Sequence, residues 1–279
     1  MKKQGKRSNQ HKLIIVFSLS CSLLYVTLLL TSLVGELLVE DTDNLDLSSI
    51  RRASTIDSGS FVYPFYIALD SLFSIGRYDL KDAEHHFRMA LRRYPLHLYS
   101  WYGLARTYYE TGNKDKGNLL FDQMLNAITI NGELAWNSGI FLFVKGEGMR
   151  GSRFIAKYLR LTPGAFREVL DLCYRLDIGI RQIYFDVLGE RPEYLERLMS
   201  YLADRKKIAD IEFVWNTVSH DSLSEKVKVK ACNSLINDGR HELAEEIWRN
   251  ISVQKIKKTI NNSDFEYGIA GGCYGWRIG

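Results

Sequence analysis

A short glycine pattern is the clearest candidate for cofactor chemistry in this sequence. Residues 146–151 read GEGMRG, which matches G-x-G-x-x-G, and Asp171 follows twenty residues after the last glycine. In dinucleotide-binding proteins such glycines let a pyrophosphate approach a helix N-terminus, and the acidic residue binds the ribose. That chemistry requires a strand before the glycines and a βαβ unit around them.

The elements around GEGMRG do not form such a unit. The preceding stretch, ELAWNSGIFLFV, has the length and spacing of a helix, and no second strand follows. We therefore predict that Gly146 lies in a turn between two helices. Gly151 then supplies a small residue on the second helix, and the chain is expected to bind no cofactor.

Other reactive residue types lack a functional spacing. The four cysteines form no C-x-x-C pair, and the six histidines show no ligand spacing with them, so no metal site is predicted. The motifs G-x-S-x-G, G-x-x-x-x-G-K-[ST] and H-E-x-x-H are absent from the sequence. We predict no catalytic residues and a chain that is not an enzyme.

The distribution of charge argues against nucleic acid as a partner. Five of the 37 basic residues precede residue 36, where no acidic residue occurs. The remainder therefore carries 32 basic and 33 acidic residues, a nearly neutral body. Nucleic-acid binding depends on a basic surface, so none is expected.

The N-terminus predicts a membrane anchor. Residues 1–12 are basic, and the 22 residues 13–34 carry no charge. As a helix they reach about 33 Å, enough to cross a hydrocarbon core. We predict a transmembrane signal-anchor helix at 13–35 in a bacterial cytoplasmic membrane, with the N-terminus cytoplasmic and the body periplasmic. A cleaved signal peptide is the alternative, and residues 36–61 are predicted to be a polar linker.

The body of the chain has an internal period. Ala83, Phe87, Ala90 and Pro95 are spaced by four, three and five residues, and Pro163 lies two periods of 34 residues after Pro95. This pattern resembles the tetratricopeptide repeat (TPR) family. The resemblance implies an all-α solenoid of helical hairpins, in which small residues allow close helix packing. Its predicted parts are three repeats over 62–165, a degenerate repeat or joint over 166–191, and two helical pairs over 192–257.

The same resemblance implies a partner-binding surface. First-helix side chains in this family line a concave groove that binds other proteins. Tyrosine, tryptophan and arginine are also common at binding hot spots. The alternative is that these aromatic residues pack against the neighbouring helix. The predicted groove residues are Tyr99, Tyr102, Arg106, Tyr109, Glu133, Trp136 and Phe143.

Residues 258–279 differ from the repeats because glycines alternate with aromatic residues. They resemble the start of a β-sandwich found after such repeats in bacterial surface-polysaccharide proteins, so a short β tail or a truncated sandwich is predicted. Two functions follow. The first is a non-catalytic, membrane-anchored scaffold for protein–protein interaction on the extracytoplasmic side. The alternative is a glycan-associated factor in exopolysaccharide or O-antigen assembly or export.

Overall fold

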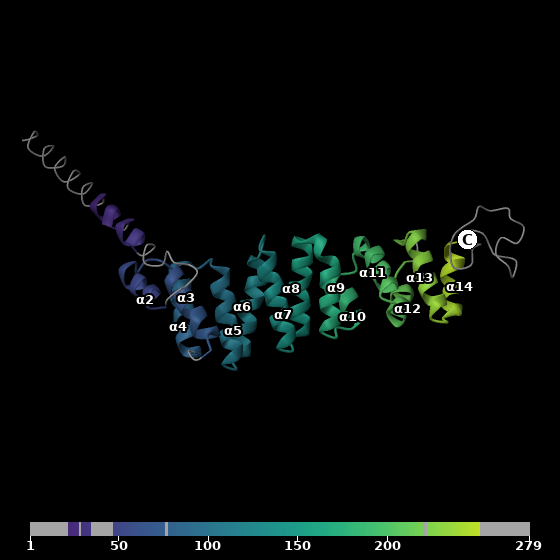
Figure 1. Cartoon of the computed structure of the whole chain (residues 1–279), viewed down its shortest axis with the longest axis horizontal. Helices are drawn as coiled ribbons and strands as arrows, with labels where there is room; N and C mark the ends of the chain where they lie inside the picture. The colour runs from purple at the N-terminus through teal and green to yellow at the C-terminus, as the bar shows by residue number, and fades with distance from the viewer. Residues whose placement is uncertain (1–21, 28, 35–46, 76–77, 220–221, 252–279) are drawn as a thin grey trace, which may run out of the picture. The chain divides into compact units, whose positions relative to one another are not determined.

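The computed structural model describes residues 22–27, 29–34, 47–75, 78–219 and 222–251 (Figure 1). All regular elements among these residues are helices, and none of these residues lies in a strand. The chain divides into two compact units, Met1–Thr129 (unit 1) and Ile130–Gly279 (unit 2). Each unit is built from helices that pack against their neighbours in sequence.

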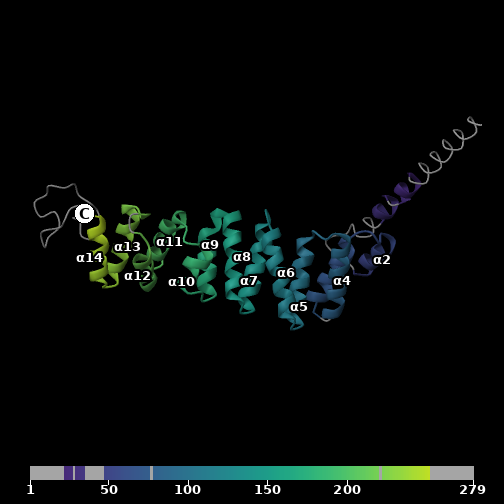
Figure 2. The ribbon, with the colours of Figure 1, turned by 180° about the vertical axis from the view of Figure 1, so that it is seen from behind.

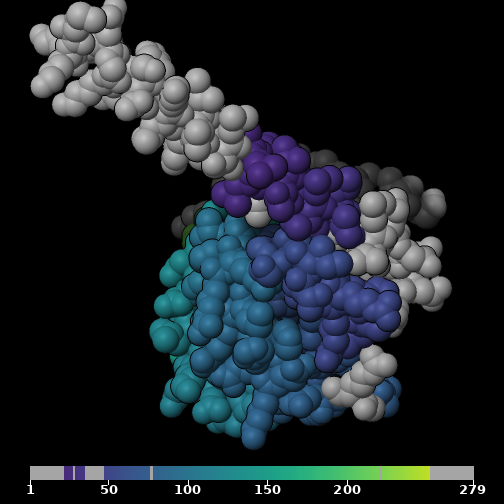
Figure 3. Space-filling model, turned by 90° about the vertical axis from the view of Figure 1, so that its left-hand side faces the viewer, coloured from purple at the N-terminus to yellow at the C-terminus, as the bar shows by residue number. Residues whose placement is uncertain are grey.

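In unit 1, two helical hairpins follow the helix α2, and residues 22–27 and 29–34 before α2 are also helical. The helix α3 pairs with α4, α5 pairs with α6, and α2 packs on α3. Figure 2 shows these pairs from behind, and Figure 3 shows α2 beside the following helices of unit 1 in space-filling form. The bounds are α2 Leu47–Ile56, α3 Val62–Phe73, α4 Leu80–Arg93, α5 Leu98–Glu110 and α6 Lys114–Ala127.

The sequence of α4 explains how the first hairpin closes. The Asp79 carboxylate accepts hydrogen bonds from the backbone N–H groups of Lys81 and Asp82, which caps the helix N-terminus. Ala83, Phe87 and Ala90 then form one fully buried face. The Phe87 ring lies so close to α5 that a Cβ atom on Gly103 would stand 2.2 Å from its Cζ atom. Glycine at 103 therefore permits this close approach.

Unit 2 continues the hairpin pattern with one irregular pair. The helices α7 and α8, α11 and α12, and α13 and α14 form regular pairs, whereas α9 is followed by a short turn of α-helix and a π-helix. The bounds are α7 Gly132–Val144, α8 Gly148–Leu161, η2 Pro163–Ala165, α9 Phe166–Arg175, α10 Ile180–Gln182, η3 Ile183–Val187, α11 Pro192–Asp204, α12 Ile208–Thr217, α13 Glu225–Asn237 and α14 His241–Ile251.

The same turn recurs at the end of five first helices in the described residues. In each, one residue adopts a positive φ, and the next N–H donates to a carbonyl five residues earlier at 2.8–2.9 Å. This is the Schellman arrangement that ends many helices. The positive-φ residues are Gly112, Gly146, Asp177, Lys206 and Gly239, spaced 29–34 residues apart.

The predicted fold class requires one correction. No helix within the described residues is long and apolar enough to span a membrane. The transmembrane helix predicted at 13–35 is therefore withdrawn, and residues 1–21 lie outside the described part. The membrane as a partner stays a prediction. The predicted bacterial membrane location stays a prediction, because no observation tests it.

Two further regions differ from, or lie beyond, the expectations. Within the predicted linker 36–61, residues 47–56 form the helix α2, because Ile50 and Ala53 bury one face against Tyr63 and Ile67. Polar composition concealed this helix, since only one face of its ten residues is apolar. The predicted glycine-rich tail at 258–279 lies outside the described residues.

Candidate functional site

Gly146 lies in a turn between two helices, as predicted, and residues 148–151 form the start of the second helix. Gly146 has a φ of 80° and follows α7, and the Glu147 N–H donates to the Leu142 carbonyl at 2.8 Å. Gly151 lies on α8 against the Phe143 ring, where a Cβ atom would stand 2.9 Å from Cδ2. The same turn occurs at Gly112 and Gly239, so these glycines serve hairpin geometry.

Asp171 connects two helices of unit 2. One of its carboxylate oxygens accepts a hydrogen bond from the Tyr201 hydroxyl at 2.7 Å and another from Arg205 at 2.8 Å. Both donors come from α11 or its C-cap, whereas Asp171 lies on α9. The carboxylate that resembled a ribose ligand in the sequence is therefore engaged in helix packing.

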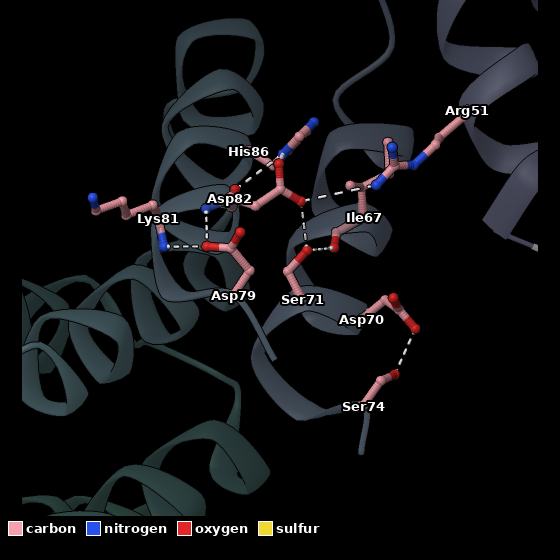
Figure 4. Close-up of polar contacts among 9 residues, drawn as sticks. All are labelled: Arg51, Ile67, Asp70, Ser71, Ser74, Asp79, Lys81, Asp82 and His86. Atoms are coloured by element: carbon pink, nitrogen blue, oxygen red, sulfur yellow. Dashed lines mark hydrogen bonds and ion pairs between the residues drawn. The ribbon is translucent and has the colours of Figure 1, made fainter. Parts of the chain in front are cut away.

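A serine, an aspartate and a histidine meet in unit 1 (Figure 4). The Ser71 hydroxyl lies 2.7 Å from an Asp82 carboxylate oxygen and 2.9 Å from the Ile67 carbonyl. The His86 Nδ1 atom lies 3.2 Å from the other Asp82 oxygen. Nucleophilic triads place histidine between serine and aspartate, whereas here aspartate lies in the middle. Ser71 is also 4% exposed, so this cluster joins α3 to α4 and offers no accessible nucleophile.

Four predicted groove residues lie on α5 in unit 1. Tyr109 is buried, and its hydroxyl donates to Asn118 on α6. Arg106 donates to the Tyr102 hydroxyl at 3.1 Å, and its guanidinium lies 4.6 Å from the centre of the half-exposed Phe73 ring. Tyr99 is half-buried. Tyr102, Arg106 and Phe73 therefore form a small surface cluster, while Tyr109 belongs to the hairpin interior.

The other three predicted residues lie on α7 in unit 2. Glu133 is exposed. The Trp136 ring packs on Tyr158 of α8 at 4.8 Å between ring centres, and Phe143 packs on Gly151. Both aromatic side chains thus contribute to the contact between α7 and α8. Partner binding by these residues stays a prediction.

A groove in unit 2 was not predicted from the sequence; it is formed by the first helices of successive helical pairs. The groove has a volume of about 530 Å³ and is open to solvent. It runs along the first helices of three successive helical pairs, α9, α11 and α13. On α11 its residues recur at intervals that place them on one helix face, and this spacing was visible in the sequence. The lining residues are Gly164, Phe166, Arg167, Glu196, Arg197, Ser200, Tyr201, Asp204, Ser224, Lys226, Val227 and Lys230.

Internal contacts engage both carboxylates of the groove. Glu196 accepts a hydrogen bond from the Ser224 backbone N–H at 2.7 Å, at the N-terminus of α13. This contact with Ser224 lowers the pKa of Glu196. Asp204 forms an ion pair with Lys230 at 2.8 Å. Each carboxylate thereby links α11 to α13.

Two stacked tyrosines lie at the contact between α9 and α11. The rings of Tyr174 and Tyr201 are 6.0 Å apart and nearly parallel. Tyr174 donates to Asp210 at 2.6 Å, and Tyr201 donates to Asp171. Burial raises the pKa of Tyr201 to about 12, with the hydrogen bond to Asp171 adding to the effect, and burial likewise raises the pKa of Tyr174. The structure thus favours both phenols in their neutral form.

These shifts predict a loss of stability at alkaline pH. A phenol whose pKa is about 10 in the unfolded chain and about 12 in the folded chain stabilises the fold below pH 10. That contribution disappears as the pH rises from about 10 to about 12. We expect the urea midpoint, followed by circular dichroism, to fall across this range. The absorbance of the phenolate should rise at a higher pH than that of a free tyrosine.

The variant Tyr201→Phe tests the assignment because it removes one titrating group and keeps the ring. Its urea midpoint should fall less steeply above about pH 10 than that of the wild-type chain. An identical pH dependence in both proteins would show that Tyr201 titrates like an exposed tyrosine.

Comparison with known proteins supplies no family. No family model matches the sequence, and no curated protein is significantly similar to it. The chain is similar to the solved structure of YrrB, described as a TPR protein with an unusual peptide-binding site. The sequence identity is 15%, the TM-score is 0.35, and the match covers 74% of this chain and 92% of YrrB.

Two solved structures of IFIT1 are also similar to this chain. A monomeric mutant with Gppp-AAAA has 16% identity, a TM-score of 0.37, and coverage of 75% of this chain and 46% of that one. The human dimer with m7Gppp-AAAA has 15% identity, a TM-score of 0.36, and coverage of 75% and 45%.

The chain has a TPR-like fold. This assignment follows from the helical hairpins and from the recurring turns with their shared hydrogen bond. The resemblance stated from the sequence is thus confirmed at the level of the fold. The link to surface polysaccharide stays a prediction, since the tail that suggested it lies outside the described residues.

Proposed function

We propose that the chain is a protein-interaction scaffold and that the groove of unit 2 binds an extended segment of a partner protein. The observation that carries this proposal is the shared lining of the groove. Three successive first helices, α9, α11 and α13, each contribute side chains to one open groove of about 530 Å³. A partner segment lying across these helices would contact each of them in turn.

The composition of the groove supports a peptide as its occupant. Val227 and the small exposed parts of Phe166 and Tyr201 provide apolar surface, whereas Ser200 and Ser224 provide polar groups beside it. Grooves that bind peptides combine apolar contact with a few polar groups that fix orientation. The volume also lies within the range of roughly 300–1,000 Å³ that is common for binding sites.

A capture experiment with matched variants tests this proposal. The full chain, the double variant Arg197→Glu/Lys226→Glu and the control Arg181→Glu are immobilised and exposed to lysate of the source organism. Arg181 is an exposed arginine of unit 2 that lies outside this groove. Quantitative mass spectrometry then compares the bound proteins, and circular dichroism confirms that each variant is folded.

We expect specific partners to be retained by the wild-type chain and by Arg181→Glu, and to be reduced about tenfold by the double variant. A purified partner should show the same order of affinity. Equal capture by all three proteins would place the interaction surface elsewhere.

A further inference from the structure

The lining of the groove in unit 2 contains three cations that form no ion pair with any carboxylate in the part of the chain that the structure describes. Arg167 lies on α9, Arg197 on α11 and Lys226 on α13, so each first element supplies one of them. Among the described residues, none of the three forms an ion pair, whereas the groove carboxylates Glu196 and Asp204 are already engaged. The groove thus has an excess of positive charge that its own acidic residues leave uncompensated.

The environment of Arg197 shows how one of these cations is held in place. Its guanidinium lies 4.3 Å from the centre of the Phe166 ring and donates to the Pro163 carbonyl at 3.2 Å. These contacts hold the planar group over the Phe166 ring, and no described carboxylate forms an ion pair with it. A guanidinium held in this way is well suited to accept a carboxylate at its remaining N–H donors.

The residues that line the groove have a net positive charge. Glu225 precedes Lys226 and Glu168 follows Arg167 in the sequence, but neither lines the groove. Lys230, the fourth basic residue of the lining, is neutralised by Asp204. The four basic and two acidic lining residues therefore leave two net positive charges facing the occupant.

We infer that the groove selects an acidic, extended segment of a partner protein, with carboxylates placed to meet Arg167, Arg197 and Lys226. Packed helices are about 8–10 Å apart, and a segment in the extended polyproline II conformation advances about 3.1 Å per residue with three residues per turn. Aspartate or glutamate at every third residue would therefore lie on one face of the segment and meet successive first helices. The inference rests on the proposed peptide-binding function and specifies its chemical class.

An array of random ten-residue peptides, grouped by net charge, tests this inference with the full chain. We expect bound signal to rise roughly tenfold from basic to acidic peptides, and to fall as salt is added. The variant Arg167→Glu/Arg197→Glu/Lys226→Glu should lose this preference for acidic peptides, whereas Arg181→Glu should keep it. Folding of each variant is confirmed by circular dichroism.

Two measurements on the best acidic peptide complete the test. Replacing its glutamates and aspartates with glutamine and asparagine should weaken binding about tenfold by fluorescence anisotropy. A single-stranded DNA oligonucleotide of equal charge should compete poorly. Equal binding of the amide peptide, or stronger binding of the oligonucleotide, overturns the acidic-peptide inference.

The failure of this inference can be told apart from that of the proposed function. If peptides of all charges bind equally and the triple variant loses them all, the groove binds peptides without acidic selectivity. The proposed function then stands and the inference falls. If neither the wild-type chain nor Arg181→Glu binds any peptide class, both fall.

Discussion

Replacing Trp215 with alanine is expected to lower the free energy of unfolding by about 3–5 kcal/mol. Trp215 on α12 is 1% exposed and lies in the main core of unit 2. Its indole N–H donates to the Glu246 carboxylate of α14 at 2.8 Å. The substitution removes a large apolar side chain, leaves a cavity and deprives Glu246 of a donor. Urea denaturation followed by far-ultraviolet circular dichroism measures the loss.

The substitution Trp101→Ala is the matched control. Trp101 is only partly buried, and its indole N–H donates to the Pro95 carbonyl at 2.7 Å. The same chemical change there should cost about 1 kcal/mol, because little core volume is lost. Equal losses at both tryptophans would contradict the assignment of Trp215 to the core.

The second large effect concerns the contact between Phe87 and Gly103 in unit 1. Phe87→Ala removes a fully buried ring and should cost about 3–5 kcal/mol. Gly103→Ala should cost about 1–3 kcal/mol, because the new Cβ atom would stand 2.2 Å from the Phe87 ring. Circular dichroism during urea denaturation again measures both.

The double variant separates this contact from general effects on the helix. Without the ring, the Cβ atom at position 103 meets no clash and improves helix propensity by up to about 1 kcal/mol. Gly103→Ala should therefore stabilise the Phe87→Ala background. Gly59→Ala serves as control, because a Cβ atom at position 59 would make only an ordinary van der Waals contact at 3.6 Å. Strictly additive losses would show that the two residues are not coupled.

The all-helical fold was predictable from the sequence because the spacing of small and large residues reflects packing between neighbouring helices. Small residues at Ala83 and Ala90 flank Phe87 on one helix face, and all three are fully buried. Gly146 was assigned to a turn by the helical length of the preceding stretch, and its positive φ confirms that assignment. In both cases the physical cause acts within a few residues of the pattern.

The membrane helix shows where this reasoning failed. An uncharged run of 22 residues met the length criterion. However, helix length is a property of the folded backbone, and no described helix is long and apolar enough to cross a membrane. The helix α2 was missed for the opposite reason, because its polar exposed face outweighed Ile50 and Ala53 in a reading of composition.

The candidate site was only partly accessible from the sequence. The groove residues predicted from the sequence lie at 99–143, whereas the groove in unit 2 is lined by α9, α11 and α13. These residues were predicted because several of them are aromatic. In the structure, Tyr109, Trp136 and Phe143 contribute to hairpin packing. The positive charge of the groove in unit 2 depends on which cations form internal ion pairs. Those pairs join residues such as Asp204 and Lys230 on different helices, so the sequence alone does not reveal them.

The turn that recurs at Gly112, Gly146, Asp177, Lys206 and Gly239 has a consequence for how such a chain can change its length. Each turn satisfies its own backbone hydrogen bonds, whichever residue occupies the left-handed position. Gene duplication or deletion of one period, cut at equivalent points of two such turns, would therefore preserve every turn bond. Insertions of whole hairpins are then expected to be tolerated, whereas insertions of a fraction of a period would break the register of the packed helices.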